Sequence, residues 1–399
     1  MIKYLKNNII QLPVLFIAAY FLSKYADLGV LKLFFTISAL FLDLIGLLIP
    51  ILVFVYLFST ILNVGEKALN FLITVFSLAI VSNMLTVLYT FCLSHLFLPF
   101  ILMKSIVVYN SKDPLTPFLA FPFSGTSYLT IAMGSAIISA LCFLLYADNN
   151  LNKKLTDFCE ITKGSVTYIF SILVLYAFPL YIFGFLIKIF YEGHIFSIYD
   201  SILTVFLLYL LFSSLYIIIW YLISCKYSAI CFSKSLKNML PAGSAGFLTM
   251  SSAVALPLTV ASIQNTLNEQ KTAYLVAPTS VNIHLIGDNI FVILTTFTIL
   301  ILNNLSLPSF VESFPFLFIY NIAMLAAAGI PGGNVLVIVA ILQEYMSFTP
   351  EMSKLFIILY ILQDPFLTLF NILGNGAFAI FFKGLLNRFP YLINVKKST

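Results

Sequence analysis

The sequence predicts an all-α polytopic membrane protein with eight transmembrane helices and two re-entrant helical hairpins. Of its 399 residues, 61% are hydrophobic and only 9% are charged, a composition that soluble domains do not have. Apolar runs of the length that a spanning helix needs, roughly 20 residues, recur along the chain. They do not alternate with polar residues as the strands of a membrane barrel do, so we expect the spans to be helices.

The basic residues set the expected orientation. They form clusters at Lys3 and Lys6, at Lys153, Lys154 and Lys163, at Lys226, Lys234 and Lys237, and at Arg388, Lys396 and Lys397. By the positive-inside rule, both termini and every second loop lie in the cytoplasm, which requires an even number of crossings. The loop with Lys104 and Lys112 departs from this scheme. We expect an integral protein of a bacterial inner (cytoplasmic) membrane.

The first half of the chain predicts six ordinary spans, at 9–28, 31–62, 67–98, 114–147, 157–190 and 200–225. The first follows a basic N-terminus without a small-residue cleavage site, so we expect an uncleaved helix. The second, fourth and fifth are long enough for tilted helices or for ends that leave the bilayer. The five cysteines lie in or beside apolar segments without the spacing of a disulfide framework or metal site, so we interpret them as small hydrophobic residues.

Polar residues interrupt the second half at membrane depth. The interruptions are Ser251–Thr259 within 229–262, Asn282–Asn289 within 270–302 and Ala328–Asn334 within 314–347; a last helix follows over 352–387. Irregular backbone at this depth must line a cavity or be buried in protein, because lipid cannot satisfy its hydrogen bonds. Two re-entrant hairpins that enter from opposite sides give the inverted repeat of a secondary transporter. Ordinary helices with Gly/Pro kinks are the alternative.

The tips of both hairpins place small or polar residues at a helix start. Free N–H groups and the positive end of the helix dipole would let Ser251-Ser252 and Gly332-Gly333 meet a carboxylate. The same residues can instead ease helix packing in lipid.

The last helix carries a polar stripe. Asp364, Thr368, Asn371 and Asn375 recur at spacings of four, three and four, so they share one face. An acid within a membrane helix costs roughly 3 kcal/mol on insertion scales and is a functional candidate by default. The alternative is contact between helices, worth about 0.6 kcal/mol per hydrogen bond.

Six stretches, in order and spacing, resemble the dicarboxylate/amino acid:cation symporters, the family of the glutamate transporters. They are Leu42–Phe54, Tyr176–Pro179, Gly243–Thr259, Thr279–Asp288, Ala326–Asn334 and Gln363–Ile380. The resemblance implies a homotrimer and an elevator-type movement. Residues 1–66 and 114–199 would form the scaffold and trimerisation helices, and 67–113 and 200–399 the transport domain. The bound solute would lie between the hairpin tips, the broken helix and the last helix.

The expected substrate contacts lie at the two hairpin tips, on the broken helix and on the last helix, where Asp364 is included because of the polar stripe. These residues are Ser251, Ser252, Asn282, Ile330, Pro331, Gly332, Gly333, Asp364, Thr368, Asn371 and Asn375. The chain departs from the family at two of them. Thr368 stands where amino-acid transporters place an aspartate, and Asn371 stands where transporters of acidic substrates place an arginine. Without the arginine, a second substrate carboxylate loses its bidentate partner, so we expect a carboxylate other than glutamate or aspartate, or a neutral amino acid.

The cation sites of the family are also altered. Ile286 and Ala379 replace aspartates that the resemblance assigns to cation binding, while Ser82, Asn83 and Asn375 match positions that contribute ligands. A partial sodium site is therefore one expectation, with no cofactor and no other metal site.

His284 and Asp288 offer proton coupling as the rival to sodium. They lie four residues apart, so in a continuous helix they would face the same side, and such a pair can exchange a proton near neutral pH. A neutral imidazole hydrogen-bonded inside the bundle is the alternative for His284.

These observations predict a symporter for a small organic solute. The alternative is an uncoupled channel or a solute sensor that kept the fold after losing cation coupling. An enzyme is not expected, because the sequence has no nucleophile elbow, metal motif or phosphate loop beside its acidic residues. The expected partners are the solute, the lipid bilayer and further copies of this chain, with no nucleic acid.

Overall fold

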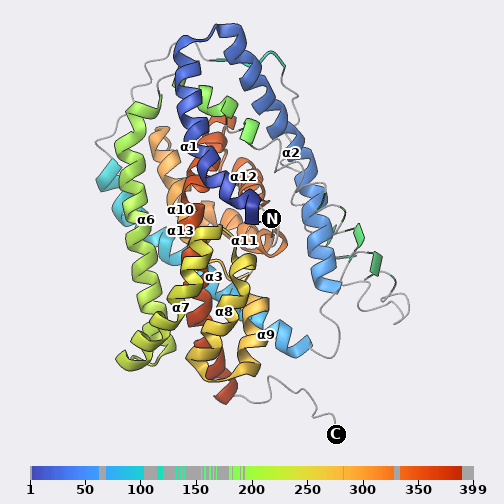
Figure 1. Cartoon of the computed structure of the whole chain (residues 1–399), viewed down its shortest axis with the longest axis vertical. Helices are drawn as coiled ribbons and strands as arrows, with labels where there is room; N and C mark the ends of the chain where they lie inside the picture. Colours follow the sequence, from blue (N-terminus) through green and yellow to red (C-terminus); the bar gives the residue numbers. More distant parts are fainter. Residues whose placement is uncertain are drawn as a thin grey trace.

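Figure 1 shows the computed structural model, in which every regular element of the described part is a helix. That part comprises residues 2–62, 69–102, 115–119, 179–181, 183–188, 190–191, 194–281, 283–327 and 333–388, with single residues and pairs between 131 and 168. The helices are α1 (Ile2–Tyr25), α2 (Leu28–Leu62), α3 (Leu69–Leu102), α6 (His194–Ser224), α7 (Ala229–Thr249), α8 (Ser252–Leu267), α9 (Gln270–Ser280), α10 (Ile286–Leu302), α11 (Phe310–Ala327), α12 (Gly333–Tyr345) and α13 (Pro350–Arg388).

The helices follow the expected segments closely. Four of the six ordinary spans appear as α1, α2, α3 and α6, while the expected spans 114–147 and 157–190 fall largely outside the described residues. Within the described chain, α3, α6 and α13 are long and apolar enough to cross a membrane. Each of the three interrupted segments forms two helices: α7 with α8, α9 with α10, and α11 with α12.

Helix α10 lies at the centre of the molecule. It packs against α3, α6 and α13, and every residue in it except Ile301 is buried. This burial on all sides explains why the helix is apolar around its whole circumference. Helix α2, by contrast, packs against α11 and α12, so it belongs to the periphery of the described helices.

Helices α7 and α8 form a hairpin against α13. Ser228 caps α7 by accepting a hydrogen bond from the N–H of Cys231 at 3.3 Å, as serine favours at a helix start. The helix ends at Met250, whose left-handed φ of 51° turns the chain before α8 begins. α7 packs against both α8 and α13. The two chain segments therefore lie antiparallel with a short turn between them.

The turn between α6 and α7 corrects the interpretation of two cysteines. Cys225 and Cys231 form a disulfide, with their Cα atoms 5.6 Å apart, within the range that a disulfide spans. The positive φ angles of Lys226 and Tyr227, 50° and 61°, fold the chain back over this short distance. The spacing in sequence did not reveal the pairing, because it depends on this local turn.

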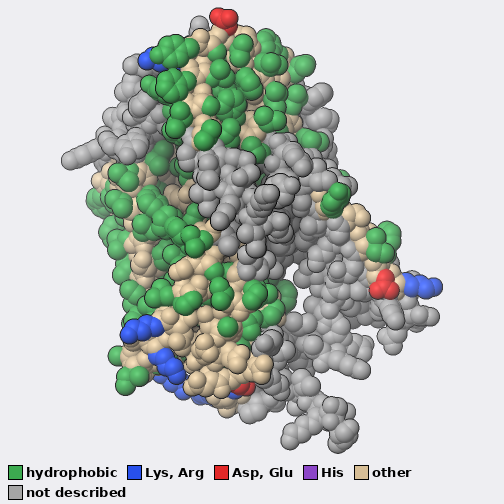
Figure 2. All heavy atoms as spheres, viewed as in Figure 1, with side chains coloured by type: hydrophobic (Ala, Val, Ile, Leu, Met, Phe, Trp, Pro, Cys, Tyr) green, Lys and Arg blue, Asp and Glu red, His purple; other side chains and the backbone are tan. Residues whose placement is uncertain are grey.

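The described surface is largely hydrophobic. Figure 2 shows apolar side chains over most of its coloured area, with basic side chains gathered at its lower left. Lys226, Lys234 and Lys237, from the α6–α7 turn and α7, are exposed. This separation of apolar and basic surface fits a protein whose sides meet lipid and whose end meets water.

Candidate functional site in the helix core

The chain leaves helical geometry between α9 and α10. Ser280 ends α9, and its carbonyl accepts the N–H groups of Ile283 and His284 at 3.0 and 2.9 Å. Leu285 is not helical, with φ −121° and ψ 62°, and α10 begins after it. The described residues between the two helices are Val281 and Ile283–Leu285, so α10 begins within the expected Asn282–Asn289 interruption.

Asn83 of α3 holds this broken backbone. Its Nδ2 donates to the carbonyl of Ile283 at 2.6 Å, and its Oδ1 accepts the N–H of Leu285 at 3.1 Å. One buried amide therefore satisfies a donor and an acceptor that the break removes from helical pairing. Such compensation is needed because backbone groups buried away from water are costly without partners.

His284 connects three elements from within the break. Its Nε2 lies 2.9 Å from Oγ of Ser82 in α3, and its Nδ1 lies 3.1 Å from Oδ1 of Asn375 in α13. With this orientation of the amide, Nδ1 donates and Nε2 accepts the Ser82 hydroxyl proton. The ring is fully buried, and its centroid lies 4.6 Å from that of Phe378. A neutral imidazole satisfies both contacts.

Asp288 and Asn371 tie the start of α10 to α13. Asn371 Oδ1 accepts the N–H of Gly287 at 2.8 Å, and its Nδ2 donates to Asp288 Oδ2 at 2.5 Å. The hydroxyl of Tyr360, also in α13, donates to the other oxygen of Asp288. Asp288 lies in the first turn of α10, where the helix dipole stabilises negative charge.

Gly287 allows the closest approach of the two helices. A Cβ atom at this position would lie 2.4 Å from the carbonyl oxygen of Leu367, a backbone atom that cannot move alone. Any other residue here would push α10 away from α13. The absence of a side chain is therefore what brings Asp288 within reach of Asn371.

The His284 and Asp288 side chains have different partners in this arrangement. The expected same-side pairing depended on a continuous helix over both residues, but α10 begins after His284. His284 contacts Ser82 and Asn375, whereas Asp288 contacts Tyr360 and Asn371. The structure describes two polar clusters on α13, about one helical turn apart.

Asp364 lacks the partners that Asp288 has. It is partly buried, and no hydrogen bond or ion pair to it occurs among the described residues. Thr368, one turn later, is buried, and its methyl group faces Gly246 of α7. Within the stripe, Asn371 and Asn375 therefore face the broken helix, whereas Thr368 faces α7.

The packing of α7 on α13 places the α7–α8 turn near Asp364. Gly376 of α13 packs against Met239 early in α7, whereas Gly246 late in α7 packs against Thr368 and Ile372, so the two helices run in opposite directions. Helix α7 ends about one turn after Gly246, and Asp364 lies about one turn before Thr368 in α13. The start of α8 is therefore level with this acid.

The structure leaves part of the expected site undescribed. Ser251 and Ser252 are half-buried at the α7–α8 turn, and Gly333 begins α12. Asn282, Ile330, Pro331 and Gly332 lie outside the described residues.

Tyrosines form a part of the site that the sequence analysis missed. Besides Tyr360, Tyr320 of α11 donates to Asn289 Oδ1 at 2.9 Å, next to Asp288. Extending the polar stripe one turn upstream would have found Tyr360, which precedes Asp364 by four residues. No comparable signal marks Tyr320, because its contact joins helices that are distant in sequence.

A comparison with known families identifies the relationship. The sodium:dicarboxylate symporter family matches residues 16–385, a range that includes every residue of the candidate site. The chain belongs to this family. A comparison with curated proteins finds no match. As a member of the sodium:dicarboxylate symporter family, the chain is an integral membrane protein of a transporter class.

This symporter carries its core charges in unusual places. Ile286 and Ala379, where the resemblance places cation-binding aspartates, are both fully buried and apolar. A Cβ atom added at Gly374 would lie 2.6 Å from Cδ1 of Ile286, so hydrocarbon fills that position. The acids of α10 and of the middle of α13 are instead Asp288 and Asp364.

Proposed function

We propose that this member of the sodium:dicarboxylate symporter family is a secondary active symporter that moves a small organic solute by an elevator movement. The observation that carries the proposal is the α9–α10 break, held by Asn83 and facing the polar stripe of α13. A secondary transporter uses discontinuous helices near the bilayer midplane to bind its solute and coupling ion. The two hairpins would re-enter the membrane from opposite sides and enclose the solute.

The packing of the helices supports an elevator. Helices α3 and α6 to α13 form one connected set of contacts, in which α11 packs against α3 and α12 against α13, and α2 contacts this set at α11 and α12. This pattern fits a transport domain of residues 67–113 and 200–399 that slides along a scaffold of residues 1–66 and 114–199. The scaffold would assemble as a homotrimer.

The coupling ion is proposed to be sodium or a proton. Hard cations such as sodium take oxygen ligands, and near His284 the Ser82 hydroxyl and the Asn375 carbonyl already contact the imidazole. The carboxylates of Asp288 and Asp364 offer sodium better ligands. A proton could bind either at these acids or at His284.

Uptake into proteoliposomes tests this function. Labelled succinate, lactate and alanine represent the proposed solute classes, and sodium and pH gradients are imposed separately. We expect accumulation of at least one probe above its outside concentration. Asp288→Asn and Asp364→Asn should each lower the initial rate at least tenfold while the protein remains inserted. Asp27→Asn, an exposed acid at the α1–α2 turn, is the control and should keep the normal rate. Normal rates in both site variants would contradict the site.

The loss of carboxylates at Ile286 and Ala379 favours one alternative, an uncoupled channel or a solute sensor. The same experiment separates it from a symporter. A channel would only equalise the concentrations of a probe across the membrane, and a sensor would bind without moving it. Accumulation driven by either gradient excludes both.

A further inference from the structure

The end of α6 and the start of α7 form a basic surface without acidic residues. Between residues 201 and 268 the chain has no aspartate or glutamate, and its only charged residues there are Lys226, Lys234 and Lys237. All three lysines are exposed, and none of them forms an ion pair among the described residues. The surface therefore carries positive charge that no acid in the described part of the chain neutralises.

This surface lies where α6 leaves the membrane. The apolar span of α6 covers Ile202–Ser224, which is 23 residues. A helix of that length is about 35 Å long, slightly more than a hydrocarbon core of about 30 Å. Lys226 and Tyr227 follow the span almost directly, so we expect them at the level of the lipid headgroups.

A disulfide and a tight turn fix the shape of this surface. Cys225 and Cys231 are joined, and every residue between them is exposed. The left-handed residues Lys226 and Tyr227 form the turn, and the N–H of Tyr227 donates back to the carbonyl of Leu222 at 2.7 Å. Because a surface with a fixed shape loses less conformational entropy on binding, this turn is suited to holding a ligand.

Two large apolar side chains protrude beside the lysines. Tyr227 is 76% exposed and Ile230 is 84% exposed. Water is an unfavourable environment for such side chains, whereas at a bilayer boundary a tyrosine ring lies among the headgroups and an isoleucine can contact hydrocarbon. The group that covers this surface should therefore combine negative charge with an apolar part.

The lysines of α7 extend toward the same turn. Ile230, Lys234 and Lys237 are spaced by four and three residues, so they share the outer face of α7. Gly243, on the opposite face, packs against α13. Side chains of an α-helix lean toward its N-terminus, so both lysines of α7 extend toward Lys226 and the membrane boundary.

We propose that this surface, formed by Lys226, Tyr227, Ile230, Lys234 and Lys237, binds an anionic phospholipid of the surrounding bilayer. The three ammonium groups contact the phosphate of the headgroup, and Tyr227 and Ile230 contact its glycerol and the upper part of its acyl chains. Lysine clusters directly beside a membrane span recognise such lipids. An anionic phospholipid joins negative charge to hydrocarbon at the depth where this surface lies. The inference does not depend on what the protein transports.

Thermal unfolding of the purified full-length protein in detergent tests the proposal. The probes are phosphatidylglycerol, phosphatidylcholine with the same acyl chains, and glycerol 3-phosphate, each at the same concentration. We expect phosphatidylglycerol to raise the unfolding temperature by about 3 °C or more above its value in phosphatidylcholine, and high salt to reduce this difference. Equal unfolding temperatures in the two lipids would overturn the proposal. An equal rise with glycerol 3-phosphate would also overturn it, because the site would then bind a soluble phosphate.

Two matched triple variants localise the effect. The first removes the charges of the surface, with Lys226→Gln, Lys234→Gln and Lys237→Gln, and it should lose most of the temperature difference between the two lipids. The second removes the same charge elsewhere and should keep the difference; it carries Lys24→Gln, Lys32→Gln and Lys154→Gln. Equal losses in both would overturn the site, because net charge alone would then attract the lipid. If the first triple variant does not fold, its three single variants decide, and an unchanged difference in all of them would overturn the site.

Discussion

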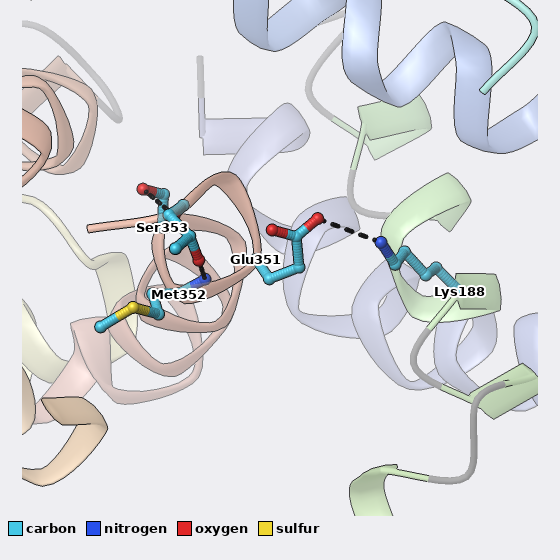
Figure 3. A network of polar contacts seen from close by, with 5 residues as sticks. Lys188, Glu351, Met352 and Ser353 are labelled. Atoms are coloured by element: carbon cyan, nitrogen blue, oxygen red, sulfur yellow. Dashed lines mark hydrogen bonds and ion pairs between the residues drawn. The ribbon is translucent and has the colours of Figure 1, made fainter. Parts of the chain in front are cut away.

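Charged groups at the start of α13 have partners in the described structure, whereas Asp364 in the middle of the same helix has none. Glu351 pairs with Lys188 at 3.2 Å, as Figure 3 shows. Lys188 and Lys354 lie over the ring of Phe35, at 4.7 and 4.3 Å from its centroid. Asp288, which faces the middle of α13, has two hydrogen-bond donors. The difference separates charges that join helices from a charge that joins none among the described residues.

The largest change in stability is expected when Asp288 loses one of its hydrogen-bond donors. Asn371→Leu leaves Asp288 with one donor fewer and the Gly287 N–H without its acceptor. A buried N–H without an acceptor and a buried carboxylate with one donor fewer lower the free energy of unfolding by roughly 3–5 kcal/mol. Thermal unfolding of the purified protein in detergent measures this loss.

Tyr360→Phe is the matched comparison. It removes one donor to Asp288 but keeps the Gly287 contact, so its cost should be smaller, roughly 1.5–3 kcal/mol. A loss below about 1 kcal/mol for Asn371→Leu would show that Asp288 does not depend on these hydrogen bonds.

An opposite and smaller effect is expected at the unpartnered acid. Asp364→Leu removes a partly buried carboxyl group that makes no hydrogen bond within the described chain, and it should raise the free energy of unfolding by roughly 1–3 kcal/mol. Transport should be lost at the same time. If Asp364→Leu destabilised the protein in the same unfolding assay, Asp364 would contribute to stability as Asp288 does, and the two acids would not differ in this respect.

The smallest effect is expected for the pair in Figure 3. The Glu351 side chain is 58% exposed, and exposed ion pairs contribute about 0–1 kcal/mol. Glu351→Gln should therefore change stability by no more than this amount. Because salt screens exposed charges, the difference from the unaltered protein should shrink at high ionic strength. A larger loss that resists salt would mean that this pair is effectively buried.

The polar stripe of α13 and the three interruptions could be predicted from the sequence, because spacing alone determines which residues of a helix share a face. The partner of each residue could not. Asn371 and Asn375 lie on one face, yet one reaches Asp288 and the other reaches His284. Which residue each asparagine contacts depends on where the break between α9 and α10 ends. The non-helical Leu285 marks that end, and nothing in the sequence predicts it.

The order of the helical segments could also be predicted from the sequence, but the contacts between segments distant in the chain could not. The Asn83 contact to the broken backbone and the Tyr320 contact to Asn289 each join helices far apart in the chain. The Cys225–Cys231 disulfide depended on two left-handed residues. Each of these contacts comes from the packing of the whole fold.

The bare backbone at Gly287 has a mechanical consequence. With a hypothetical Cβ only 2.4 Å from the Leu367 carbonyl, and with Asn371 bonded to the same backbone, α10 and α13 cannot slide past each other without a collision. The two helices are packed together as one rigid pair. We therefore expect any movement of α10 during transport to carry α13 with it, and any hinge to lie outside their contact.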